Sequence, residues 1–224
     1  RILSSAASDV YKRQVIASPI IVQIESNLVP QLLALLGLPI ALRVFYREKD
    51  EVDLSKVKPL ILGRLIGGPF GLLLLLNLSE KYLSISVGLI VLIAGAGSFF
   101  GWEINRNTFN SFFAGTFSGI FGMIAAIGGP PVALLYRNTK SQEFRPSLNS
   151  VFSIGILITL SLLILSGNLY FDHLLLFMLF LPIVLIGIRV SSSLFSKVSD
   201  SFIAQSVTYF SIISGLYVIF RNIN

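Results

Sequence analysis

The residues best suited to chemistry in this sequence are Gly128, Gly129, Pro130 and Pro131, which interrupt an otherwise apolar run over residues 108–136. The prolines remove amide donors and the glycines loosen the backbone, so the run predicts a broken helix. At such a break, free amides and the positive end of the following half-helix dipole favour an anion. The segment is therefore a candidate substrate-binding site, although a hinge or a tight packing point would use the same residues.

Polar residues in two other segments are candidates for the same site. Ser18 before Pro19 resembles a second helix start, with a hydroxyl that can act as a cap or a ligand. Asn149 and Ser150, followed by Ser153, open a later apolar run. They could line a cavity with the break or hydrogen-bond one helix to another, and their types leave both alternatives open.

Charged and titratable residues inside the apolar runs are few. Arg64 and Arg189 could contact an anion, but long basic side chains also extend to the membrane interface, and we favour that interpretation. His173 is the single histidine and follows Asp172 at an expected outer interface. We favour a solvated loop end over a proton relay for this histidine.

Several kinds of chemistry are excluded by residue type. The chain has no cysteine, which removes thiolate nucleophiles, disulfides and Cys-based metal sites. The apolar runs hold no pair of carboxylates, no cluster of metal ligands and no nucleophile beside a base. We therefore expect no enzyme, no catalytic residue, no metal and no cofactor.

Composition indicates an integral membrane protein that crosses the bilayer several times. Of 224 residues, 54% are hydrophobic and 12% are charged, and the mean hydropathy is +0.83. The net charge of +6 then reflects basic loops that orient the chain, and a nucleic-acid partner is not expected. Runs long enough to cross about 30 Å of hydrocarbon lie at 28–46, 59–78, 82–100, 147–167, 172–195 and 201–220.

The first residues are set apart from this pattern. Residues 1–14 are polar, contain no initiator methionine and resemble a translated adapter, so we expect a non-native leader there. Residues 15–26 are too short to span a membrane and read as the second arm of an element whose first arm is missing.

The remaining chain divides into two related parts, 15–107 and 108–224. Adding 120 to residue numbers superposes Ile66-Gly67 on Ile186-Gly187 and Gly95 on Gly215. If residues 108–136 form a hairpin, every basic residue after Arg13 except Lys81 and Arg221 lies on one side, whereas a full crossing divides these residues eight to six. A hairpin plus three crossings in each half predicts an all-α fold of two inverted-topology repeats, the first hairpin being incomplete. The loops at 47–58, 101–107, 137–145 and 196–200 would be cytoplasmic and the C-terminus outside.

Three stretches of this chain resemble the TauE/SafE family of sulfite-exporter-like permeases. They are VIASPIIVQ at 15–23, VDLSKVKPLILGRLIGGPFG at 52–71, and FSGIFGMIAAIGGPPVALLY at 117–136 with SLNSVF after a basic loop. The resemblance covers residues 15–224 and implies transport of small anions such as sulfite and sulfonates, coupled to an ion gradient. The family's Ser-Gly-rich helix before the first break is not found in this sequence.

The expected function is secondary transport of small anions by alternating access, in a bacterial inner membrane. The expected partners are the lipid bilayer, the anion and a coupling proton or cation, and a homo-oligomer is left open. The alternative is a membrane subunit or scaffold that transports nothing, for which a packing role of Gly128 to Pro131 would suffice.

Overall fold

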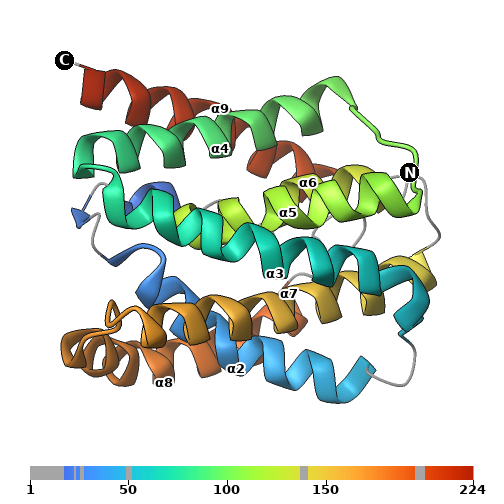
Figure 1. Cartoon of the computed structure of the whole chain (residues 1–224), viewed down its shortest axis with the longest axis horizontal. Coiled ribbons are helices and arrows are strands. Elements are labelled where there is room, and N and C mark those ends of the chain that lie inside the picture. Colours follow the sequence, from blue (N-terminus) through green and yellow to red (C-terminus); the bar gives the residue numbers. More distant parts are fainter. Residues whose placement is uncertain are drawn as a thin grey trace.

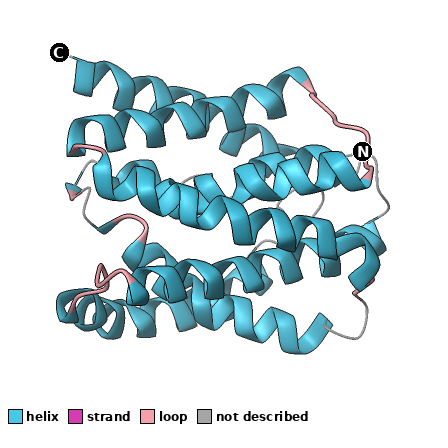
Figure 2. Cartoon of the chain, in the orientation of Figure 1, coloured by secondary structure: helices cyan, strands magenta, loops and turns pink. Residues whose placement is uncertain are grey.

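The computed structural model describes residues 18–22, 24–25, 28–48, 52–136, 141–194 and 200–223. Every element labelled in it is a helix (Figures 1 and 2). The expectation of an all-helical chain is therefore confirmed. The helices are α2 (Gln31–Glu48), α3 (Leu54–Asn77), α4 (Glu80–Phe100), α5 (Thr108–Ala125), α6 (Gly129–Tyr136), α7 (Ser141–Leu165), α8 (Phe171–Leu194) and α9 (Asp200–Ile223).

Four of these helices are long and apolar enough to cross a membrane. Their candidate spans are Ser55–Asn77, Glu80–Phe100, Pro146–Leu165 and Gln205–Ile223 within the described residues. Shorter apolar helices occupy Gln31–Arg43 and Phe171–Ile186. Large apolar side chains such as Phe70, Met178 and Ile213 lie on the outside of the bundle, where a bilayer would cover them.

The helices associate in closely packed pairs. α4 packs along α9 at one edge of the bundle, and α2 packs with α7 and α8 at the opposite edge (Figure 1). Between them α3 packs along α5 in the same direction, since Leu60 meets Gly115 and Gly71 meets Ile120. This central pair carries the break predicted from the sequence.

Local capping explains where α3 and α5 begin. The Asp53 side chain accepts hydrogen bonds from the Ser55 amide at 3.1 Å and the Ser55 hydroxyl at 2.6 Å. Asn107 similarly accepts from the Asn110 amide at 2.7 Å. Such caps satisfy amides that have no partner within a helix. They set the start of both central helices at the same end of the bundle.

The apolar run at 108–136 forms a helical hairpin. α5 ends at Ala125 and is capped by Ala126, which has a left-handed φ of 55°, and α6 begins at Gly129. The Ile104 amide donates to the Leu134 carbonyl at 3.1 Å, which brings the end of α6 back to the segment before α5. Within residues 108–136 the chain therefore turns back on itself between α5 and α6.

Candidate functional site

The break between α5 and α6 lies inside the protein. Ala125 and Ile127 are 0% exposed, and Gly128 and Pro130 are also buried. The Ser118 hydroxyl donates a hydrogen bond to the Gly128 carbonyl and so ties α5 to the start of α6. Non-helical backbone in a membrane protein is tolerated in such an interior, where other protein groups can satisfy it.

Ser18, the other candidate selected from the sequence, lies next to the break between α5 and α6. Ser18 is fully buried and its hydroxyl donates to the Ala125 carbonyl at 2.6 Å. The Pro19 side chain is buried beside it. Residues more than one hundred positions apart are therefore joined by a hydrogen bond at the end of α5.

Arg64 on α3 also reaches the break, and this overturns the expectation that it extends to the membrane interface. The residue is only 4% exposed. A Cβ placed on Gly128 would lie 2.9 Å from Arg64 Nη1, and one on Gly122 would lie 2.9 Å from Nη2. The side chain points inward because α3 packs on α5 so closely that Arg64 lies over these glycines.

A small cavity of about 20 Å³ lies beside the Arg64 guanidinium, enough for about one water. Four segments of the chain contribute to its wall. The lining residues are Leu33, Ala34, Arg64, Gly122, Ala126, Gly128, Phe152, Ile156 and Thr159. The arrangement combines one buried cation, an interrupted backbone and an α6 N-terminus, which together can stabilise negative charge.

The profile of the family described as "Sulfite exporter TauE/SafE" matches residues 16–218 of the chain. The chain belongs to the TauE/SafE family. Members of this family are membrane transporters of anions such as sulfite and are not enzymes. Comparison with curated proteins and with solved structures finds no match.

The TauE/SafE chain keeps Asn149 and Ser150 buried on α7, but neither residue lines the small cavity. The single hydrogen of the Ser153 hydroxyl is shared between the Ala41 carbonyl of α2 at 2.9 Å and the Asn149 carbonyl at 2.8 Å. Ser153 therefore links α7 to α2 by a hydrogen bond. The α7 residues nearest Arg64 are instead Gly155 and residues of the cavity wall, which the sequence analysis did not select.

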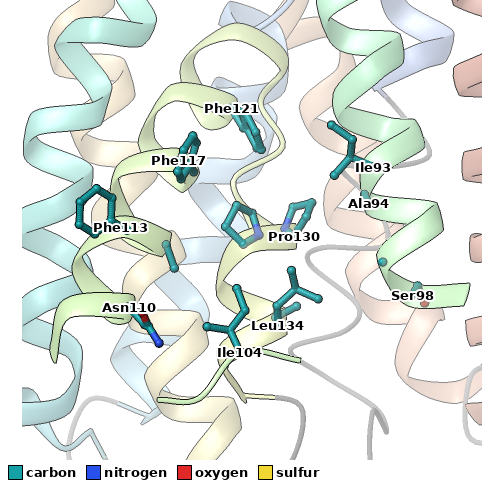
Figure 3. A pocket seen from close by; sticks show the side chains of 14 residues that line it. Ile93, Ala94, Ser98, Ile104, Asn110, Phe113, Phe117, Phe121, Pro130 and Leu134 are labelled. Atoms are coloured by element: carbon teal, nitrogen blue, oxygen red, sulfur yellow. The ribbon is translucent and has the colours of Figure 1, made fainter. Parts of the chain in front are cut away.

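A larger cavity of about 300 Å³ lies between α4 and the hairpin (Figure 3). Phe117 and Phe121 from α5, Pro130 and Leu134 from α6 and Ile93 from α4 face it, so its wall is mainly apolar. An apolar wall does not compensate a desolvated charge. Size alone would therefore select a cavity unsuited to a small anion, and the smaller one beside Arg64 fits the chemistry better.

His173 has a structural role that differs from the expected solvated loop end. Its side chain is 5% exposed, and its Nδ1 accepts a hydrogen bond from the Tyr170 amide at 3.0 Å. The histidine thus caps the start of α8. The Arg189 side chain lies outside the described residues, and no group of three His, Cys, Asp or Glu side chains suited to a metal occurs in the described part of the chain.

Proposed function

We propose that this chain is a secondary transporter of small anions that works by alternating access, with sulfite, sulfonates or related sulfur compounds as substrates. The observation that carries the proposal is the buried interruption between α5 and α6, which meets the Ser18 hydroxyl inside the bundle. Paired breaks in the two halves of a transporter are the best sequence pointer to its substrate site.

The proposed substrate site consists of Gly128 to Pro131 together with Ser18 and Pro19. The amides at the start of α6 and the positive end of its dipole would face the anion. Asn149 and Ser150 are proposed as further lining when α7 moves relative to the hairpin. Their burial in the described arrangement supports an interior position for both residues.

We also propose that residues 15–107 and 108–224 are inverted repeats. The α4–α9 contact supports this, because Gly95 lies against Ile212 and Gly215 lies against Leu92. Under the shift of 120 residues, Gly95 corresponds to Gly215 and Ile212 corresponds to Leu92. The two contacts are therefore the same contact with the halves exchanged. A two-fold axis between repeats produces such reciprocal contacts.

The cycle we propose couples movement of the anion to a proton or cation gradient across a bacterial inner membrane. The proposal holds for a monomer and for a homo-oligomer alike. The cytoplasmic side would carry the ends of α2, α4 and α6, and the C-terminus would lie outside. Reporter fusions at Asn224 test this orientation. A cytoplasmic C-terminus would contradict the inverted repeat.

The proposed function is tested by sulfite flux into proteoliposomes that contain the full-length protein, with and without a proton gradient. Gly129→Leu is expected to abolish saturable flux because its side chain fills the space beside the break. Gly97→Ala is the matched control, since its added Cβ would make ordinary contacts at 3.4 Å with Trp102 and 3.7 Å with Leu134. Undiminished flux in Gly129→Leu would refute the site, and no flux of any tested anion would favour the scaffold alternative.

A further inference from the structure

We infer that Arg64 is the charged ligand of the transported anion and that the site takes a singly charged oxyanion. The inference rests on the proposed function and extends it by naming a ligand residue and a substrate charge. It starts from the position of the guanidinium at the junction of α3, α5, α6 and α7.

Glycines on three sides leave room for this guanidinium. A Cβ on Gly155 of α7 would lie 2.0 Å from Arg64 Cζ, so no side chain fits there without displacing the group. A Cβ added to Gly122 of α5 would lie 2.9 Å from Arg64 Nη2, and one added to Gly128 at the break would lie 2.9 Å from Nη1. Three separate segments thus carry glycine where one cation needs space.

The guanidinium is not neutralised by the described part of the protein. Arg64 Nη1 is buried and has no hydrogen-bond partner there, and no carboxylate of that part forms an ion pair with Arg64. A buried charge without a partner is strongly disfavoured, and buried charges in proteins are normally paired. An anion held between Arg64 and the N-terminus of α6 would supply the missing partner.

The charge of this partner follows from the site. Arginine presents its donors as a planar fork that matches two oxygens of one anion. A monoanion such as hydrogen sulfite or a sulfonate neutralises the single buried cation, whereas a dianion leaves one uncompensated negative charge in an apolar interior. The site should therefore select sulfonate-type monoanions over sulfate.

Entry of such an anion requires a rearrangement. The cavity beside Arg64 has a volume of about 20 Å³, which suits one water. Its wall joins Leu33 and Ala34 of α2 to Phe152 and Ile156 of α7. Displacement of α2 against α7 would enlarge it, so anion binding is linked to relative motion of the two halves.

The test measures anion binding and flux separately on the full-length protein. Unfolding temperature in detergent is recorded at pH 7 with methanesulfonate, a monoanion, or sulfate, a dianion, at equal ionic strength. Methanesulfonate should raise the Tm of the wild type and sulfate should not. Arg64→Gln should lose this response and about 100-fold or more of the flux, whereas Arg64→Lys should keep a weaker response.

Arg43→Gln, which changes an exposed arginine, is the matched control and should behave as the wild type. Without anion, Arg64→Gln should unfold at the same temperature as the wild type or higher, because it removes an uncompensated charge. A lower Tm in that variant would instead indicate a structural arginine and overturn the inference.

The remaining outcomes separate this inference from the proposed function. If Arg64→Gln keeps both the Tm response and the flux, the arginine is not the ligand, but anion transport stands. If sulfate stabilises the protein as well as methanesulfonate, selection for a single charge is wrong. If the wild type moves no tested anion, the proposed function fails.

Discussion

Among the described residues, the α3–α5 and α4–α9 pairs both pack through glycine, but of these two only the α3–α5 pair lies around a buried charge. In the α3–α5 pair, a Cβ on Gly67 would lie 2.0 Å from the Thr116 carbonyl oxygen and one on Gly115 would lie 2.2 Å from the Leu60 oxygen. In the α4–α9 pair, a Cβ on Gly95 would first meet the Ile212 side chain at 2.9 Å. Both pairs use small residues for close approach.

The difference lies in what accompanies the close packing. Beside the α3–α5 contact, the chain breaks at Gly128 and buries Arg64, whereas the described α4–α9 contact holds the hydroxyl pair of Ser98 and Thr208. Glycine packing is common to both pairs and cannot identify a site by itself. The combination of interrupted backbone and buried cation distinguishes the central pair.

Stability should separate the two pairs most strongly. Gly67→Ala forces a methyl group against the Thr116 backbone, which cannot rotate away, and should destabilise the protein by about 3 kcal/mol. Gly95→Ala meets Ile212 Cγ1 at 2.9 Å and Ser211 Cβ at 3.0 Å, contacts that are less severe than the one at Gly67, and should cost about 1 kcal/mol. Denaturant unfolding in mixed micelles measures both. Equal costs would show that the pairs are packed alike.

Transport should separate them next. Gly155→Ala places a methyl group at the Arg64 guanidinium, a flexible group that can tilt, so the fold should survive. A misplaced charge-assisted hydrogen bond weakens anion binding, and flux at subsaturating anion should fall about tenfold. Gly95→Ala serves as the control with unchanged flux per folded molecule. A normal flux in Gly155→Ala would separate Arg64 from the transport site.

The smallest effect concerns the helix starts of the two pairs. Asp53→Ala removes the α3 cap and should lower Tm slightly at neutral pH, whereas Ser79→Ala at the start of α4 should not, because Ser79 makes no side-chain capping bond. Hydrogen bonding from Ser55, with Lys56 nearby, lowers the pKa of the Asp53 carboxyl. Its contribution is therefore present above the pKa of the unfolded state and lost as pH falls through the lower folded value.

That loss on acidification gives the control for the cap. The Tm difference between wild type and Asp53→Ala should persist through neutral pH and shrink once the carboxyl is protonated. A difference that stays constant into acid would mean that the charge of Asp53 contributes nothing to the start of α3.

Local sequence signals predicted the apolar helices and the interruption between α5 and α6. Of the six spans expected, four are long enough to cross a membrane within the described residues, and Gln31–Arg43 and Phe171–Ile186 are shorter apolar helices. Apolar runs long enough to cross a bilayer are written in consecutive residues, and so is the Gly128 to Pro131 interruption. The distribution of basic residues further predicted that the chain after the interruption returns toward the start of α5. These features are determined by residues close together in the chain, and they can therefore be predicted from one sequence.

The surroundings of Arg64 could not be predicted in the same way. Hydropathy gives the depth of an arginine in a span but not which neighbouring helix faces it, so extension to the interface was the expected outcome. Gly155 lies about ninety positions away and reads alone as an ordinary small residue of an apolar helix. His173 illustrates the same limit, because its hydrogen bond to Tyr170 depends on the turn before α8.

The hydrogen bond from Ser18 to Ala125 has one further consequence. It joins two distant parts of the chain through a hydroxyl and a carbonyl that are both shielded from solvent. Pulling them apart in a dry interior would leave two groups unsatisfied, at about 1–3 kcal/mol each. Water must therefore enter when the Ser18 hydroxyl and the Ala125 carbonyl separate. Opening of the protein at this point and hydration of its interior are then a single event.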